Sequence, residues 1–405
     1  MSDAAQSGRA AGLALTLALC FGAAMCEGMD IQAAGVAAGG ISQEFRPTPG
    51  QLGLFFAAAN LGLIAGALFG GRLADRIGRK PVLTASILVF GACSLFTGLA
   101  QDMNSLTAAR LLTGLGLGGA MPNMIALVAD ATAERSRNAT IATTYIGMPV
   151  GGTVASLIVL GLAPAQWRWL FFLGAAAPLA VGLLLTRFLR EPSRSPAAPG
   201  GRQVAPVSEL FRHGRLGRTL VIWAGFFASA LTLHLMLNWL PLLLQGRGLS
   251  KGDAGLAQVA FNLMGAGGAL IAGRLLDTRL RGLGVGLSIL AIPLALLLLA
   301  EAPAQVAGLA LAAGLLGAGV LSVTVILYGV AGDCYPSWIR GTGMGAAVGS
   351  TRLGALAGPT LAAVLLGAGR TPAQVLISLL PVVLAAGLCV GWLNRPRRAP
   401  RLAAA

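Results

Sequence analysis

Long apolar runs separated by short polar segments dominate the chain. A helix needs about 20 apolar residues to cross a bilayer core of about 30 Å. At that length the pattern predicts twelve membrane-spanning helices. They lie near residues 12–40, 51–71, 82–100, 105–129, 139–162, 168–188, 218–244, 254–276, 284–300, 305–330, 342–366 and 372–393. We therefore expect an all-α membrane protein with twelve transmembrane helices.

One long polar interruption, residues 189–217, divides the chain. Its Pro, Gly, Ser and Arg content is typical of a linker. It separates residues 1–188 from residues 218–405, with six predicted helices in each part. The Gly-Arg-Leu-x-Asp pattern of residues 71–75 returns at residues 273–277, about half a chain later. We expect two six-helix bundles whose interface holds the substrate site.

Composition supports a membrane protein and excludes several other classes. Hydrophobic residues make up 56% of the chain and charged residues 11%, where soluble domains have about a quarter charged. The net charge of +15 comes from basic residues scattered between apolar runs, so we expect no nucleic-acid partner. Five Cys without paired spacing and only two His indicate neither disulfides nor a metal site, and no cofactor is expected.

The distribution of the 29 Lys and Arg residues orients the spans. Most lie in the tails and in the connections that share their side with the tails. The opposite side holds Arg46, Arg168, Arg247, Lys251 and Arg370. Because positive loops stay inside, we expect both termini and the linker to be cytoplasmic.

Two acidic residues, Glu27 and Asp30, lie well inside a predicted span. Three residues apart, they share a helix face. A charge at that depth costs several kcal/mol unless it is paired, hydrated or neutralised. We expect at least one of the two to take up a proton near neutral pH, as a proton carrier must. The alternative is a structural pair neutralised by Arg110, which would hold the first and fourth spans together.

Two arginines also lie inside spans. Arg110 has a depth comparable to that of Asp30 and is long enough to reach it. Protonation of Asp30 would free Arg110 for a substrate carboxylate, so Arg110 is a candidate for binding the substrate and for coupling it to the proton; alternatively it is a fixed structural cation. Arg352 lies about 15 Å into the eleventh span, near the midplane. We expect Arg352 to clamp a substrate carboxylate. The alternative is that backbone carbonyls, Glu27 or Asp30 neutralise Arg352.

Uncharged polar and aromatic residues inside the spans are weaker substrate-binding candidates. His234 and Asn238, four residues apart, suit a phenolic hydroxyl, although a His on an apolar face is as often a packing residue. The remaining candidates serve either the substrate or helix-to-helix hydrogen bonds and interface anchoring. They are Asn60, Tyr145, Trp239, Gln258, Asn262 and Tyr328.

Several motifs resemble a known family. Residues 71–80 (GRLADRIGRK) resemble the loop 2–3 signature of the major facilitator superfamily, and Arg110-x-x-x-Gly114-x-Gly116 resembles its fourth-helix motif. Residues 27–30 (EGMD) are similar to an element of the aromatic acid:proton symporters. Residues 27–41, 237–244 and 352–359 are closer to the 3-(3-hydroxyphenyl)propionate transporter branch. Glu27 stands where most members have Asp.

The same loop contains a candidate conformational latch. Its residues are Gly71, Asp75, Arg76, Gly78, Arg79 and Lys80, with Asp277 at the equivalent place in the second half. A carboxylate there can pair with the opposite half, or cap one of its helices, in one conformation only. The alternative is a simple topogenic cluster of positive charge.

Together these features predict a multi-pass protein of a bacterial inner membrane, a monomer and not an enzyme. The resemblance implies a symporter that imports a small organic anion, a hydroxylated aromatic acid, together with protons. A proton/drug exporter is the alternative, although such exporters carry a longer Gly-Pro pattern than residues 147–152 provide. An enzyme or a sensor would need a catalytic constellation or a folded output domain, and no loop exceeds the linker in length.

Overall fold

The computed structural model describes residues 2–132, 140, 143–189, 206–276, 278–303, 305–336 and 338–394. Within these ranges the chain forms helices and no strands. The helices are α1 (Ser2–Phe45), α2 (Pro49–Ile77), α3 (Arg79–Leu99), α4 (Met103–Ala131), α6 (Gly147–Leu160), α7 (Arg168–Phe188), α8 (Leu216–Gln245), α9 (Lys251–Leu276), α10 (Arg281–Glu301), α11 (Val306–Cys334), α12 (Arg340–Gly367), α13 (Pro372–Ser378) and α14 (Leu380–Leu393). Two short 3-10 turns, Pro164–Gln166 and Val207–Leu210, precede α7 and α8.

Eleven helical stretches of the described chain are long and apolar enough to cross a membrane. Helix α12, which matches the span expected at 342–366, is not among them. It is 28 residues long, but its many small residues and Arg352 lower its mean hydropathy. It packs against α8 and α2 as part of the helical body.

The structure corrects the predicted helix boundaries in two places. Helix α1 begins at Ser2 and continues to Phe45, beyond both ends of the stretch expected at 12–40. The span expected at 372–393 is found as one apolar stretch, but it consists of two helices, because the chain is interrupted at Leu379 between α13 and α14. Pro381 stands two residues further on, and a proline lacks the N–H that would continue the helical hydrogen bonds. The two pieces together still form one apolar stretch.

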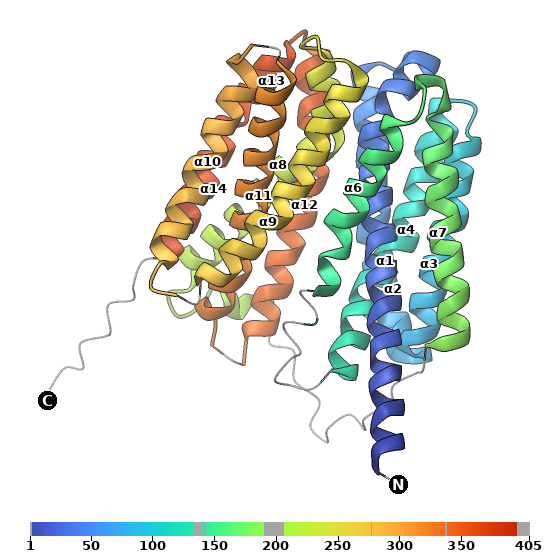
Figure 1. Ribbon diagram of the computed structural model, residues 1–405. Coiled ribbons are helices and arrows are strands. Elements are labelled where there is room, and N and C mark those ends of the chain that lie inside the picture. The colour runs from blue at the N-terminus through green and yellow to red at the C-terminus, as the bar shows by residue number, and fades with distance from the viewer. Residues whose placement is uncertain are drawn as a thin grey trace, which may run out of the picture.

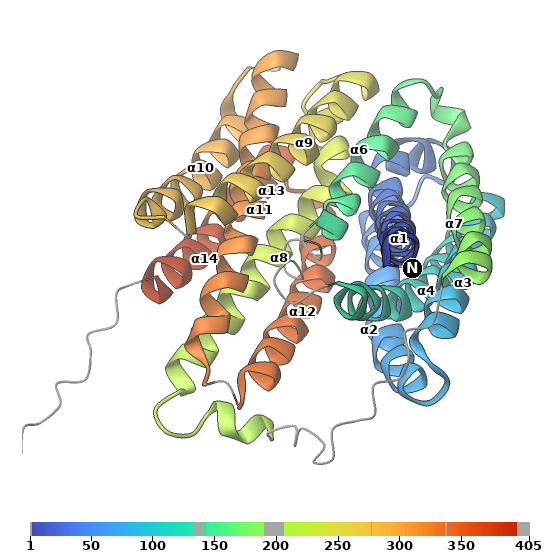
Figure 2. The same ribbon diagram turned by 60° about the horizontal axis from the view of Figure 1, so that its bottom comes forward.

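The helices form two groups side by side (Figures 1 and 2). The N-terminal group comprises α1–α7 and the C-terminal group α8–α14. Among the described helices, the main contacts between the groups are those of α1 with α8, α2 with α12 and α6 with α9; we call this surface the seam. The start of α1 and the end of α14 both point toward the bottom of Figure 1, which we call the termini side, and the opposite end is the far side.

Local sequence signals define several helix ends. Thr48 and Gln51 form a capping box at the start of α2, which satisfies backbone N–H groups that lack a helical partner. Asp102 caps α4; hydrogen bonds from the backbone N–H of Ser105 and Asn104, both 2.8 Å, hold the pKa of its carboxyl below the usual value. Gly78 joins α2 to α3 with a φ of 106°, which is readily adopted only by glycine.

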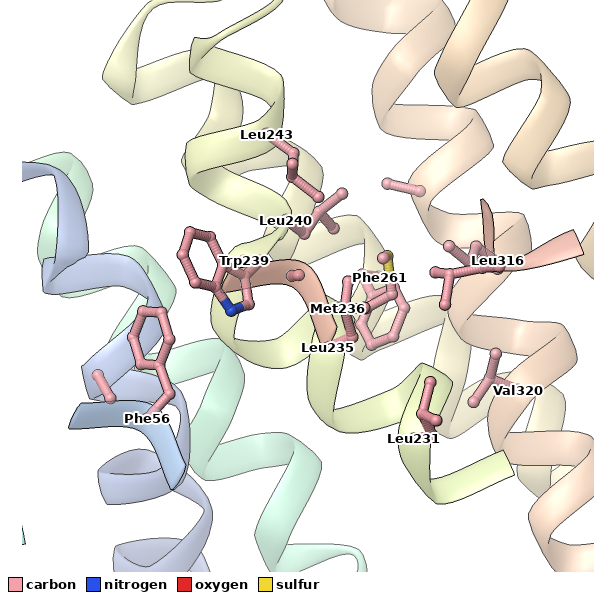
Figure 3. Close-up of a cluster of buried hydrophobic side chains, with 14 of the residues drawn as sticks. Phe56, Leu231, Leu235, Met236, Trp239, Leu240, Leu243, Phe261, Leu316 and Val320 are labelled. Atoms are coloured by element: carbon pink, nitrogen blue, oxygen red, sulfur yellow. The ribbon is translucent and has the colours of Figure 1, made fainter. Parts of the chain in front are cut away.

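Apolar side chains also pack across the seam, in the half of the seam that lies toward the far side. Phe56 of α2 meets Trp239 of α8 edge to face, with ring centroids 5.2 Å apart (Figure 3). The indole N–H of Trp239 donates to the carbonyl of Pro359 in α12 at 3.1 Å. Trp239 thereby fixes α8 against α12 and presents its ring to the other group.

Candidate functional site

Asp30 and Arg110 form a buried ion pair inside the N-terminal group. An Nη of Arg110 lies 2.7 Å from Asp30 Oδ2, and the two side chains are 2% and 1% exposed. Ser94 of α3 donates a hydroxyl hydrogen bond to Asp30 Oδ1 at 3.4 Å. The guanidinium also lies over the Phe55 ring, 6.0 Å from its centroid. This arrangement compensates both charges and ties α1 to α4.

Glu27, one helical turn before Asp30, faces the seam. It is buried and interacts electrostatically with Arg352 of α12 and with Asp30. Among the described residues it has no ion-pair partner within 4.0 Å. Glu27 and Arg352 are therefore an attracting pair of opposite charges, one from each group, without a direct bond between them.

Three further side chains lie within electrostatic range of one or both members of this pair. Tyr145 interacts electrostatically with Glu27, Arg352 and Tyr328, and His234 and Tyr328 each interact with Arg352. We call Glu27, Tyr145, His234, Tyr328 and Arg352 the seam cluster. The two tyrosines are 41% and 39% exposed although they lie within apolar stretches. The cluster combines a carboxylate, a guanidinium, an imidazole and two phenols drawn from five helical segments.

The polar side chains on α8 are partly engaged by their own helix. Nδ1 of His234 lies 3.0 Å from the carbonyl oxygen of Ala230. Asn238 donates to the carbonyl of His234 at 2.7 Å. Asn238 also lines a small cavity of about 10 Å³ between the groups, together with Asn60 and Arg110; that volume suits about one water molecule.

Buried amides bridge the seam toward the far side. Gln32 of α1 donates to the carbonyl of Leu237 in α8 at 2.9 Å. Its own amide oxygen accepts from Gln258 and from Asn262 of α9, each at 3.3 Å. We call Gln32, Gln258 and Asn262 the amide cluster. It holds three helices together across the seam.

Two more hydrogen bonds cross the seam. Asn60 donates to the carbonyl of Ala355 at 3.2 Å, and Lys251 donates to the carbonyl of Leu162 at 3.0 Å. With those of the amide cluster, five such bonds join described residues of the two groups, all on the far side of the seam cluster. At Gly35 the backbones nearly touch, because a Cβ there would lie 2.2 Å from the oxygen of Leu237.

Toward the termini side the helices are more open. On α12, an added Cβ at Gly341, Gly345 or Gly349 would meet no heavy atom within 4 Å. Arg352 is half-buried, and its neighbours Tyr145 and Tyr328 are exposed. The hydrogen bonds that cross the seam between described residues therefore gather on the far side of the seam cluster, and Arg352, Tyr145 and Tyr328 are less completely buried than the amide cluster.

The proposed latch is only partly described. Gly71, on α2, has open space where a Cβ would stand, and Lys80 donates to the carbonyl of Thr186 in α7 at 3.1 Å. Arg76 is exposed and Arg79 half-buried. The side chain of Asp75 and the whole of Asp277 lie outside the described residues. Their role as a latch stays a prediction.

The structure thus divides the sequence candidates into three sets. Glu27, Tyr145, His234, Tyr328 and Arg352 meet in the seam cluster. Asp30 and Arg110 pair with each other beside it. Asn60, Trp239, Gln258 and Asn262 form hydrogen bonds between helices. Of the described residues, no group of three or more His, Cys, Asp or Glu is placed to hold a metal ion.

Sequence reasoning missed Gln32 and Ser94. Gln32 is the centre of the amide cluster, and Ser94 is a second partner of Asp30. Gln32 is a polar residue in the apolar stretch that contains Glu27 and Asp30, which was a usable signal. Ser94 gave no comparable signal, because a serine in a membrane helix readily satisfies its hydroxyl on its own backbone.

Two helical groups with charged side chains at their seam define a multi-pass membrane transporter of the two-bundle kind. The family model described as Major Facilitator Superfamily matches residues 20–328 and 248–405. The chain belongs to the major facilitator superfamily.

Relatives in the same family are transporters rather than enzymes. The chain is 41% identical over 394 residues to the 3-(3-hydroxy-phenyl)propionate transporter of Escherichia coli (strain K12), covering 96% of each chain. It is 31% identical to a 4-hydroxybenzoate transporter of Pseudomonas putida, covering 91% of this chain and 89% of the relative. A gallate transporter of the same organism is also 31% identical, covering 88% of this chain and 86% of the relative.

Solved structures share the fold at low sequence identity. A D-xylose-proton symporter matches with a TM-score of 0.72 and 17% identity, over 93% of this chain and 96% of that one. A bacterial homologue of the human lysosomal transporter Spinster, in an inward-facing and occupied conformation, matches with a TM-score of 0.75 and 16% identity, over 95% and 98% of the two chains. These likenesses establish the architecture alone.

Proposed function

We propose that the chain is a proton-coupled symporter that imports a small aromatic carboxylate across a bacterial inner membrane. The observation that carries this proposal is that Glu27 of one group and Arg352 of the other lie within electrostatic range of each other inside apolar helices. The relatives that transport hydroxylated aromatic acids support the substrate class. Both termini are cytoplasmic in this proposal, twelve spans form two bundles over residues 1–188 and 218–405, and the structure is open to the cytoplasm.

Competition for Arg352 is the proposed coupling step. When Glu27 is ionised, its charge attracts the guanidinium and weakens the binding of a second anion. A proton on Glu27 removes that attraction, and Arg352 is then free to hold the substrate carboxylate through two parallel N–H···O bonds. On the cytoplasmic side, loss of the proton restores the attraction and releases the substrate.

Asp30 and Arg110 have a different part in this mechanism. Their direct ion pair lies within one group, so it moves with α1 and α4 as a unit. The positive charge of Arg110 offsets the negative charge of Asp30 and so limits the total negative charge next to Glu27. The pair thereby keeps the environment of Glu27 constant while the two groups rock around the site.

The test is uptake into proteoliposomes with an acidic exterior, with 3-(3-hydroxyphenyl)propionate as the probe. We expect accumulation above the external concentration, and a protonophore should abolish it. Accumulation that persists without a proton gradient would contradict proton coupling. The absence of any flux of this acid and of 4-hydroxybenzoate would contradict the substrate class.

The clamp role of Arg352 has its own variant. Arg352→Lys keeps the positive charge but loses the planar fork, so the substrate concentration for half-maximal uptake should rise about tenfold or more. Arg340→Lys, at an exposed position of the same helix, is the matched control and should behave as wild type. An unchanged half-maximal concentration for Arg352→Lys would show that Arg352 does not clamp the substrate carboxylate.

A further inference from the structure

We infer that His234 distinguishes hydroxylated from unhydroxylated acids, with Nε2 of its ring accepting a hydrogen bond from an uncharged hydroxyl of the substrate. This inference rests on the proposed function and deepens it. It assigns a binding partner to the end of the substrate that lies away from the carboxylate.

The hydrogen bond to α8 fixes the tautomer. Nδ1 of His234 lies 3.0 Å from the carbonyl oxygen of Ala230. A carbonyl oxygen can only accept, so Nδ1 must carry the hydrogen. In a neutral imidazole the other nitrogen then has a lone pair and no hydrogen. Nε2 is therefore an acceptor, unless the ring gains a second proton.

The two ends of the substrate have different partners. His234 lies within electrostatic range of the Arg352 guanidinium, which attracts a carboxylate. The same lone pair at Nε2 repels a carboxylate. The imidazole consequently selects a neutral donor, while the carboxylate goes to Arg352.

Nε2 is available for a ligand. Among the described residues it has no hydrogen-bond partner, and the His234 side chain is only half-buried. The neighbouring polar side chain on the same helix face, Asn238, is directed at the His234 carbonyl instead. The ring thus keeps a free acceptor within the seam cluster, apart from the hydrogen bonds of the far side.

The other polar groups of the cluster do not provide this selectivity. Tyr145 and Tyr328 carry hydroxyls that both donate and accept, so they tolerate a hydroxyl, a carbonyl or a carboxylate equally. The Nδ1-protonated imidazole is selective because Nε2 only accepts. An unhydroxylated ring would leave this acceptor unpaired when the site closes, which is the condition under which a hydrogen-bonding site rejects an analogue.

Binding of a matched pair of acids tests the inference. Purified full-length protein at pH 7.5 is titrated calorimetrically with 3-(3-hydroxyphenyl)propionate and with 3-phenylpropionate. We expect wild type to prefer the hydroxylated acid, and His234→Phe to lower that preference about tenfold while the affinity for 3-phenylpropionate stays the same. In His234→Gln the amide oxygen reaches a place near Nε2, so much of the preference should return. The exposed His213 provides the control variant His213→Gln.

A spectroscopic measurement does not depend on the folding of a His234 variant. The chain has two histidines, so His213→Gln leaves His234 as the only one in a ¹⁵N-histidine spectrum. We expect the Nδ1–H tautomer, and a shift of the Nε2 resonance with the hydroxylated acid but not with its analogue.

Each remaining outcome has a distinct meaning. An Nε2–H tautomer, an unchanged preference in His234→Phe, or an equal loss of affinity for both acids would overturn the inference but leave the transport proposal intact. If wild type bound neither these acids nor 4-hydroxybenzoate, the substrate class itself would be wrong and the inference would fall with it.

Discussion

The two carboxylates on α1 differ in what they contact. In a helix with 3.6 residues per turn, two side chains that are three residues apart point in directions that differ by about 60°. That angle directs Asp30 to Arg110 within its own group and Glu27 to the seam. Asp30 is therefore held by a direct bond, whereas Glu27 has an attracting partner on the opposite group. Of the two, Glu27 is better suited to respond to movement between the groups.

Glu27→Gln tests this assignment. The amide resembles a permanently protonated carboxyl, so Arg352 should stay free for substrate while the protonation cycle is lost. We expect exchange of labelled for unlabelled substrate to continue, and net accumulation driven by a pH gradient to disappear. Counterflow and gradient-driven uptake in proteoliposomes measure the two activities.

The control is Glu301→Gln, at an exposed residue that ends α10 on the far side. It should leave both activities unchanged. If Glu27→Gln still accumulated substrate against its gradient, the proton carrier would have to be another group.

The sequence was sufficient to select the charged residues of the site but not all of their partners. Glu27, Asp30, Arg110 and Arg352 stand out because charges inside apolar spans are costly. That Arg110 can reach Asp30 also followed from depth along the two helices. The pairing of Arg352 with Glu27 stayed one alternative among several, because it depends on the rotation and tilt of α1 and α12, which hydropathy does not encode.

At the scale of elements, α1 brings the main polar features together. Within six residues it carries Glu27 for the seam cluster, Asp30 for the ion pair and Gln32 for the amide cluster. A tilt of this one helix would change all three at once. We expect α1 to be the element through which proton binding and opening of the far side are linked.

Gln32→Leu should weaken the closed far side. The variant removes three hydrogen bonds that cross the seam, each worth about 0.5–1.5 kcal/mol net. A loss of about 1.4 kcal/mol already changes a conformational equilibrium tenfold. Hydrogen–deuterium exchange should therefore become faster in the far-side parts of α8 and α9.

Gln43→Leu is the matched control, since Gln43 is an exposed residue near the end of the same helix. Exchange in that variant should equal wild type. Equal exchange in Gln32→Leu as well would show that the amide cluster does not stabilise the closed side.

The elements themselves were largely readable from the apolar pattern. Runs of about 20 residues predicted the positions of the long helices, because bilayer thickness sets their length. The interruption at Leu379 and the extension of α1 to Ser2 were not predicted. Hydropathy reports where a segment is apolar, and it does not report where a proline breaks its hydrogen bonds or how far a helix continues beyond the membrane.

At the scale of the whole molecule, close backbone contact limits which arrangements of the groups are possible. Gly35 of α1 lies against Leu237 and Asn238 of α8, where a Cβ would approach an oxygen to 2.2 Å. Gly35→Ala should force the groups apart on the far side and favour the arrangement that opens there. Transport should slow, because the return to the far-closed state becomes costly.

Spin labels on the two groups can measure this shift. With the native cysteines replaced, Gln43→Cys and Arg370→Cys place one label on each group at the far side, and the label-to-label distance distribution should move to longer values in Gly35→Ala. Gly345→Ala adds a Cβ into open space and is the control. An unaltered distribution in Gly35→Ala would mean that α1 and α8 adapt locally.

The bonds across the seam also determine how the molecule should respond to its medium. Between described residues the donors are four neutral amides and one lysine, and the acceptors are backbone carbonyls and the amide oxygen of Gln32, so no acid–base pair is among these bonds. Interactions of this kind change little with ionic strength or between acidic and neutral media. Salinity should therefore leave the balance between the two orientations almost untouched, and acidity should act on it through the carboxylates of α1.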